Sequence, residues 1–221
     1  MLEGIPWIDF LSPDIEWEFH GLYGYVRTVE NLIGDLLKKE EEQLERVLPL
    51  DDPEEAGNRW EEHDRLRGKL MPRVFRYSST TALVTGVEAT LGTFVRFVER
   101  GTGQPFKARD RRRRKLHEEQ WSYLEGVGIT LRRLQFMDRL DNLATVRNCM
   151  VHAAGIVDHD RKPERVRVAL DHLPGFALSE GMIEVAADAV APLVDEAREW
   201  LLNVAGMIIK HFHELYEATR H

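Results

Sequence analysis

The sequence predicts an all-α protein that carries one small β-hairpin. Several long segments space their apolar residues three and four positions apart, which places these side chains along one face of a helix. Strand-like alternation of apolar and polar residues is confined to one short stretch. With 221 residues, 43% of them hydrophobic and 31% charged, the chain can bury one core, and we expect a single domain over residues 1–221.

The first helix is expected between about residues 14 and 48, either as one long helix or as two joined end to end. Its predicted apolar stripe consists of Leu22, Tyr25, Val29, Leu32, Leu36, Leu44 and Val47. Residues 51–76 are predicted to be a charged insertion, with a short helix that stops near Pro72, because proline usually ends a helical pattern.

The most apolar segment, residues 78–100, predicts a buried central helix. Ser79, Thr80 or Thr81 could cap its start, and its core face comprises Val84, Val87, Leu91, Phe94, Val95 and Val98. Glu88 lies on the flank of this face, where a charged side chain needs a partner.

The remaining elements follow in order along the chain. Helices are expected through the HEEQWSYLEG segment at 117–126, over residues 130–154 with Gly155 closing the helix, and over residues 187–218. Between the last two, ERVRVAL alternates and FALSEGMIEV offers two strand-like runs around Ser-Glu-Gly, so residues 165–185 predict the β-hairpin.

Composition narrows the class of protein. The formal net charge is -8, so any nucleic-acid contact must be local. The acidic N-terminus does not look like a secretion signal and no apolar run approaches the roughly 18 residues of a membrane span, so we expect a cytoplasmic protein without a membrane partner. No cofactor or metal is expected: GTGQP is too poor in glycine for a phosphate loop, and His159, His211 and His213 lack the spacing of zinc ligands.

A basic run follows the GTGQP turn at residues 107–115. It can be a solvated helix start, or a patch that attracts the phosphates of RNA over a Debye length of roughly 8 to 10 Å. In the second interpretation, the RNA-binding side chains are Lys107, Arg109, Arg111, Arg112, Arg113, Arg114 and Lys115.

The helix at 130–154 places an arginine within its apolar stripe. Arg147 points close to the direction shared by Phe136, Leu140, Leu143, Met150, Val151 and Ala154, so it should face protein. A buried guanidinium needs a counterion, and a pair between Arg147 and Glu88 would be a purely structural explanation. Cys149, the only cysteine, is expected to be a small buried side chain rather than a nucleophile.

A polar stripe runs beside this apolar face. Asp141, Thr145, Asn148 and His152 follow one another at offsets of four, three and four residues. A histidine with an ordinary pKa of about 6.5 suits proton transfer, and arginine holds phosphate through a bidentate fork. The pattern favours phosphoryl chemistry, whereas the simpler alternative is a helix-end histidine that bonds the last carbonyls.

Residues 147–152, RNCMVH, resemble the motif of the HEPN superfamily, in which an arginine and a polar residue precede a histidine. The small residues Ala153, Ala154 and Gly155 follow, as is common in that family. The resemblance implies a HEPN-like helical bundle that forms homodimers. Many members are metal-independent ribonucleases in defence, toxin-antitoxin or RNA-processing systems, which implies an antitoxin or regulatory protein as a further partner.

The reaction implied by this resemblance is attack of a ribose 2'-hydroxyl on the adjacent phosphate of RNA, at a cleft between two copies of the chain. Arg147 would supply positive charge, His152 would transfer protons and Asn148 would hold imidazole or phosphate, supported by Glu88, Asp141 and Thr145. The family also contains inactive members, so the alternative function is an RNA-binding or protein-interaction module.

Overall fold

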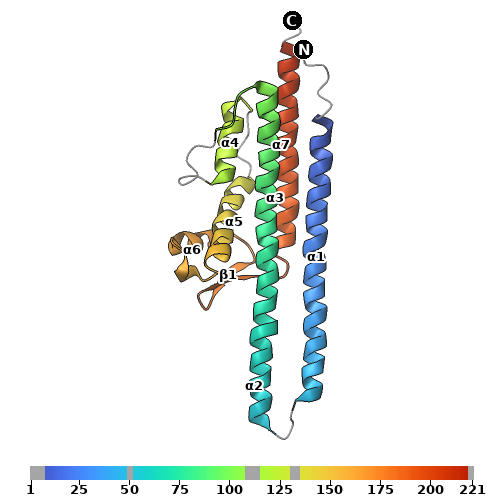
Figure 1. Cartoon of the computed structure of the whole chain (residues 1–221), viewed down its shortest axis with the longest axis vertical. Helices are drawn as coiled ribbons and strands as arrows, with labels where there is room; N and C mark the ends of the chain where they lie inside the picture. Colours follow the sequence, from blue (N-terminus) through green and yellow to red (C-terminus); the bar gives the residue numbers. More distant parts are fainter. Residues whose placement is uncertain (1–7, 49–51, 108–114, 130–134, 219–221) are drawn as a thin grey trace. The chain divides into compact units, whose positions relative to one another are not determined.

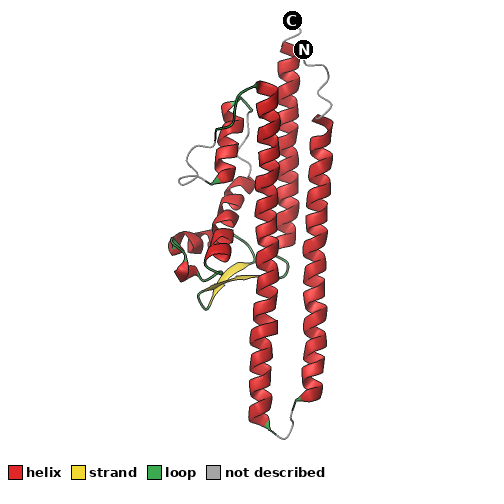
Figure 2. Cartoon of the chain, in the orientation of Figure 1, coloured by secondary structure: helices red, strands yellow, loops and turns green. Residues whose placement is uncertain are grey.

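In the computed structural model the described residues are 8–48, 52–107, 115–129 and 135–218. These residues are 81% helical, and the one small sheet among them is an antiparallel pair of strands (Figure 2). The prediction of an all-α protein with a small β-hairpin is therefore confirmed.

The chain divides into two compact units, and each is built from separate stretches of sequence. The first comprises Met1–Leu22, Ala82–Asp141 and Leu193–His221, and the second comprises Tyr23–Thr81 and Asn142–Pro192. The boundaries fall inside helices α1 (Ile8–Val47), α3 (Met71–Thr102), α5 (Gln135–His152) and α7 (Val190–Ala218). The expectation of a single domain stays a prediction.

The first unit packs the start of α1, the second part of α3 and most of α7 (Val190–Ala218) with α4 (Leu116–Gly126) and the start of α5 (Figure 1). Aromatic side chains join these helices: Trp121 stacks on Trp200 with ring centroids 5.7 Å apart, and Phe97 meets Phe212 edge-on at 5.4 Å. The predicted core face of residues 78–100 is buried. The helical spacing of residues 187–218 also predicts one apolar stripe, which is buried except for Leu215 and consists of Val190, Val194, Ala197, Leu201, Val204, Ile208, Phe212 and Leu215.

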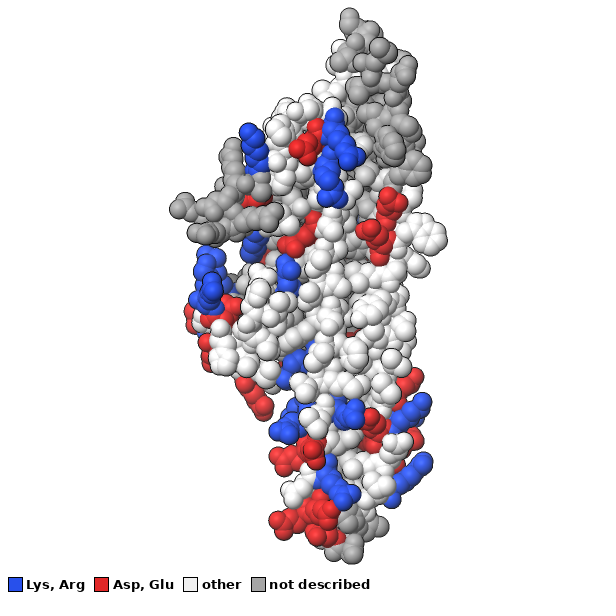
Figure 3. Space-filling view, in the orientation of Figure 1, with Lys and Arg blue, Asp and Glu red and all other residues white. Residues whose placement is uncertain are grey.

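The second unit contains an antiparallel helical hairpin. The later part of α1 pairs with α2 (Pro53–His63), the π-helix η1 (Asp64–Leu70) and the start of α3, as the ion pairs Arg76–Glu30 at 2.8 Å and Arg67–Glu40 at 3.1 Å show. No described residue of α2 or η1 is buried. Basic and acidic side chains alternate on this hairpin (Figure 3), so residues 51–76 are charged as expected but continue directly into the central helix.

The expected break near Pro72 was wrong. Helix α3 begins at Met71 directly after the π-helix η1, and the helical run Pro53–Thr102 continues through Pro72. Proline has no N–H to donate to the preceding turn, and the wider π-helical turns lie immediately before it. The hydroxyls of Ser78 and Thr80 donate to the carbonyls of Val74 and Arg76 four residues earlier. These side chains therefore bond back onto an existing helix rather than cap a new one.

The apolar stripe expected on α1 was also misplaced. The helix begins at Ile8, and its buried apolar residues are Leu11, Ile15, Phe19, Val26 and Ile33, whereas Tyr25 and Leu32 are 46% and 53% exposed. Phe19, Val26 and Ile33 follow a seven-residue spacing next to the predicted stripe. Because apolar residues occupy two neighbouring faces, periodicity alone could not select the buried one.

The hairpin is shorter than residues 165–185. Strands β1 (Phe176–Ser179) and β2 (Met182–Val185) pair around Glu180 and Gly181, whose φ angles of 51° and 79° suit a two-residue hairpin turn. Residues of ERVRVAL instead belong to α6 (Pro163–Asp171). Proline starts this helix, and Val166, Ala169 and Leu170 are buried with helical spacing, which explains why the strand interpretation failed there.

Among the residues that the structure describes, one helix has the length and composition of a membrane span. It is the continuous run Pro53–Thr102, in which the best 18-residue window has a mean hydropathy of 1.2 and is 44% buried. The central helix of a water-soluble core passes the same test, so this single helix is weak evidence for a membrane.

Candidate functional site

The motif helix α5 divides its predicted site residues between the two units. Asp141 belongs to the first unit, as does Glu88 on α3, whereas Thr145, Arg147, Asn148 and His152 belong to the second. The grouping of the four-residue polar stripe into one site stays a prediction. The pair expected between Glu88 and Arg147 stays a prediction.

The apolar face of α5 is largely as expected. Phe136, Leu140, Leu143 and Met150 are buried, whereas Val151 is 53% exposed, so its place in the stripe was wrong. Val151 lies on the last turn, where fewer neighbours surround the helix end. Cys149 is buried, and this burial raises its pKa to about 11, as expected for a structural rather than a nucleophilic thiol.

An open groove of about 640 Å³ lies beside the end of α5 in the second unit. It is lined by Asn148, His152, Ala153, His159, Asp160, Arg161 and Lys162. Both histidines, Asn148 and both cationic residues are exposed. Two imidazoles, two permanent or near-permanent cations and an amide therefore reach the same solvent-filled space.

A tight turn at the end of α5 starts the return of the chain toward the groove. Ala154 and Gly155 have φ angles of 52° and 78°, in the left-handed region, and the N–H of Gly155 donates to the carbonyl of Cys149 at 3.1 Å. A Cβ atom on Gly155 would lie 2.0 Å from the hydroxyl oxygen of Tyr77. Glycine is therefore needed here both for its φ angle and for the close approach.

The loop that carries His159 is bonded to the hairpin. The N–H of Val157 donates to the carbonyl of Gly181 at 3.0 Å, and the N–H of Ile183 donates to the carbonyl of Gly155 at 2.9 Å. Residues Val157–His159 form the short 3₁₀-helix η2. Two backbone hydrogen bonds thus hold the segment before His159 against the hairpin, which preorganises this side of the groove.

Side chains add to this anchoring. The Tyr77 hydroxyl donates to the carbonyl of Ile183 at 2.5 Å, and burial raises the pKa of Tyr77 to about 12, so it remains a donor at neutral pH. Asp158 accepts from Arg167 at 2.5 Å, and the Asp160 carboxylate accepts the N–H of Lys162 at 2.7 Å. These contacts fix the backbone on both sides of His159.

Two predicted site residues lie near the groove without lining it. Arg147 is half-buried and its Nε atom is enclosed by protein, in agreement with the expectation that it faces the interior. Thr145 is half-buried one turn earlier on α5. Sequence reasoning thus found Asn148 and His152 but treated His159 as solvated and did not single out Arg161 or Lys162.

The comparisons with known proteins do not identify the function, so it is argued from the residues of the groove. No family model matches the chain, and neither curated proteins nor solved structures gave a match. The HEPN resemblance of residues 147–152 therefore stays a prediction from the motif and from the chemistry of the groove.

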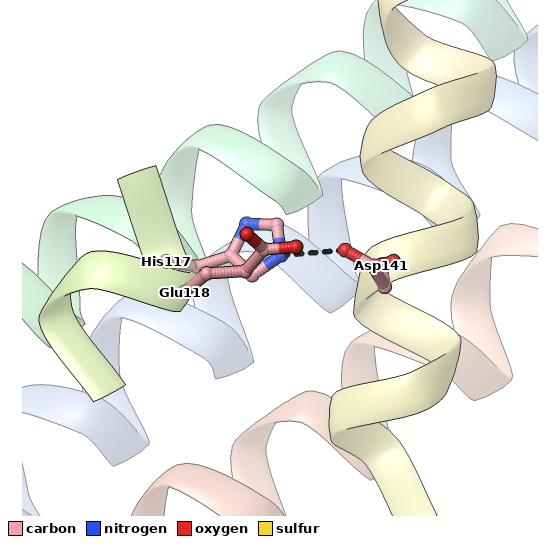
Figure 4. Close-up of side chains that lie close together, drawn as sticks. All are labelled: His117, Glu118 and Asp141. Carbon is pink, nitrogen blue, oxygen red and sulfur yellow. Dashed lines mark hydrogen bonds and ion pairs between the residues drawn. The ribbon is translucent and has the colours of Figure 1, made fainter. Parts of the chain in front are cut away.

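A second polar cluster lies in the first unit and centres on His117, which sequence reasoning missed. This fully buried imidazole places Nε2 3.2 Å from Asp141 and Nδ1 3.6 Å from Glu88 (Figure 4 shows the contact with Asp141). Lys115 donates to the Asp141 carboxylate at 2.6 Å and to its backbone carbonyl at 2.7 Å. A signal was present, because His117 shares a helical face with Trp121 and Leu124.

The charges of this cluster shift each other's pKa. Burial lowers the pKa of His117 most strongly, but the hydrogen bond to Asp141 and the nearby carboxylate of Glu88 together outweigh it, and the pKa is raised above 6.5. The hydrogen bond from His117, helped by Lys115, holds the pKa of Asp141 well below its usual range. The cluster therefore favours a protonated imidazole between two carboxylates.

His117, Glu118 and Asp141 have the donor types of a metal site, and their ligand atoms lie within 4.8 Å of one another. A competing cation is already present, however. Lys115 holds the Asp141 carboxylate with its ammonium group and the Glu118 carboxylate with its backbone N–H at 3.3 Å. A divalent ion would have to displace Lys115, so these residues fit a metal poorly.

The predicted RNA-binding run is described only at its ends. Lys107 is exposed, and Lys115 is half-buried beside Asp141. The other members, Arg109, Arg111, Arg112, Arg113 and Arg114, lie outside the described residues. Their role as an RNA-binding patch stays a prediction.

Proposed function

We propose that this protein is a HEPN-like helical bundle that acts as a metal-independent endoribonuclease. The observation that carries the proposal is the groove in which His152 and Asn148 of the motif meet Arg161 and Lys162. An exposed imidazole supplies proton transfer, and two adjacent cations attract the phosphates of RNA. An acidic protein needs such a local cationic site to hold a polyanion.

The proposed reaction is a transesterification. The ribose 2'-oxygen attacks the adjacent phosphorus, the bond to the 5'-oxygen breaks, and the products carry a cyclic phosphate and a 5'-hydroxyl. His152 takes part in the proton transfers, and Arg161 and Lys162, which line the groove, stabilise the negative charge of the phosphorane. The motif resemblance assigns this charge to Arg147, which lies half-buried on the same helix. Asn148 lies one turn before His152 on the same face of α5, so it can orient the imidazole or the phosphate.

The biological setting follows from the motif resemblance alone. It implies a homodimer in which two copies contribute His152 to one cleft, RNA as the substrate, and an antitoxin or regulatory protein as a further partner. A cytoplasmic role in defence or in a toxin-antitoxin system is part of the same proposal.

The test is cleavage of mixed, end-labelled RNA in EDTA by the parent protein, His152→Ala and the matched control His172→Ala. His172 is exposed in the same unit but does not line the groove. We expect cyclic-phosphate ends from the parent and the control only. A folded His152→Ala protein that cleaves as fast as the parent would remove the assignment.

The alternative function is RNA binding without cleavage, and it would use the same two cationic residues. Arg161 and Lys162 could hold RNA in an inactive, binding-only module, because phosphate contacts need no proton transfer. In that case RNA binding weakens with salt, and the double substitution Arg161→Ala and Lys162→Ala reduces the slope of log affinity against log salt by about 1 to 2. Binding of this kind without cleavage by the parent selects the second function.

A further inference from the structure

The groove contains a second imidazole from the same chain. His159 lies on the loop after α5, whereas His152 ends the helix itself, and both are exposed in the same open space. We propose that His159 is the second proton-transfer group of the reaction, so that the general acid and the general base both come from one chain. This inference rests on the proposed ribonuclease function and changes one part of it: the second histidine is His159 of the same chain instead of His152 of a second copy.

The position of His159 is fixed by the fold. The N–H of His159 donates to the carbonyl of Ile156 at 3.1 Å, and the next N–H, that of Asp160, donates to the carbonyl of Val157 at 3.0 Å. Ile156 also forms an isolated bridge with Met182 of the hairpin. A solvated histidine on a loose loop would not need this support, whereas a group that must meet a substrate atom does.

Two histidines satisfy the proton balance of the reaction without a metal. One neutral imidazole accepts the proton of the 2'-hydroxyl as the 2'-oxygen bonds to phosphorus. The other imidazole, protonated, donates its proton to the 5'-oxygen as the bond from phosphorus to that oxygen breaks. The two residues end in exchanged protonation states, and transfer through water restores them for the next turnover.

The groove also has the size and charge for the substrate. Its volume of about 640 Å³ lies within the roughly 300 to 1,000 Å³ of sites that enclose small ligands, so a scissile phosphate and its flanking riboses can enter. Arg161 and Lys162 lie two and three residues after His159 and carry the positive charge. Asp160 lines the groove as well, and its carboxylate accepts the N–H of Lys162.

If His152 and His159 act in the same groove, a second copy of the chain is not needed to supply a histidine. Mixing inactive His152→Ala protein with inactive His159→Ala protein should then restore no cleavage. Recovery of activity on mixing would show that the two histidines come from different copies and would overturn the one-chain arrangement.

The main experiment compares pH profiles of RNA cleavage for the parent, His152→Ala, His159→Ala and the control His172→Ala. We expect a bell-shaped profile for the parent and the control, because one imidazole must be neutral and the other protonated. Each active-site variant should lose about 100-fold or more in kcat and should lose the limb opposite to that lost by the other. His159→Asn gives a second, closely sized variant if alanine disturbs the loop.

A modified substrate tests the same roles chemically. Sulfur in place of the bridging 5'-oxygen gives a leaving group that departs without a proton, so it should restore cleavage by whichever variant has lost the alkaline limb. It should not restore the other variant. Rescue of neither or of both variants would contradict an acid and base pair.

Failure of this inference is distinct from failure of the proposed function. If the parent does not cleave RNA, the ribonuclease proposal fails and His159 loses its role with it. If the parent cleaves, His152→Ala is inactive and His159→Ala keeps full activity, the ribonuclease stands and the assignment of His159 is wrong.

Discussion

Replacing Gly155 with alanine should destabilise the protein by about 2 to 5 kcal/mol. The left-handed φ of 78° costs an alanine about 1 to 2 kcal/mol. The new Cβ would also meet the ring of Tyr77, with atoms at 2.0, 2.6 and 2.7 Å, so the ring must move. Displacing the Tyr77 hydroxyl from the Ile183 carbonyl leaves polar groups unsatisfied, which costs about 1 to 3 kcal/mol more.

The chain provides a matched control for the first of these costs. Gly181 has nearly the same φ, 79°, but a Cβ there would have no atom within 4 Å, so Gly181→Ala should cost only about 1 to 2 kcal/mol. Urea unfolding of both variants at equal m values measures the difference. In a Tyr77→Ala background, the effect of Gly155→Ala should fall to that of Gly181→Ala. Equal losses for the two glycine variants in the parent background would refute this account of the turn.

Three further predictions concern charged groups. Because the folded pKa of His117 is raised, its contribution to stability is complete below the unfolded pKa of about 6.5 and disappears as the pH rises through the folded value. His117→Gln should therefore lose more stability at pH 5.5 than at pH 9, as measured by urea unfolding. A loss that does not depend on pH would count against a charged His117. Arg76→Ala breaks the bidentate, largely buried pair with Glu30 and should cost about 2 to 3 kcal/mol of stability. Arg59→Ala breaks an exposed pair and should cost below about 1 kcal/mol. Equal urea-unfolding midpoints for the two variants would be inconsistent with this difference. Zinc should leave the Tm of the parent unchanged and raise the Tm of Lys115→Met, because lysine no longer occupies the Asp141 carboxylate in the variant. Stabilisation of the parent by zinc would show that the Lys115 ammonium group does not exclude the metal.

Periodicity predicted the fold where one face of a helix is clearly apolar. The core of residues 78–100 and the last helix belong to this class, and the Ser-Glu-Gly turn correctly located the strands. It failed on α1, where two apolar faces compete, and at Pro72, where proline usually ends a helix but the helical run continues from the π-helix η1 into α3. Tertiary contacts decide such cases.

Some residues of the candidate site could likewise be predicted from the sequence, and others could not. The spacing of Asn148 and His152 on one helix could be read directly from the sequence. The return of His159 to the same groove could not, because it depends on the left-handed turn at Gly155 and on hydrogen bonds to a hairpin further along the chain. His117 could have been found from its helical phase, but its carboxylate partners come from other helices.

The groove is local in sequence, since its residues lie between 148 and 162, but the contacts that hold its loop are not. The hydrogen bond from Tyr77 to the hairpin spans 106 positions of the chain. A small unit of structure can open on its own when its few tertiary hydrogen bonds are broken. Mild urea should therefore abolish function before the helical circular dichroism signal changes, and amide exchange should be faster in residues 156–162 than in the buried half of α5.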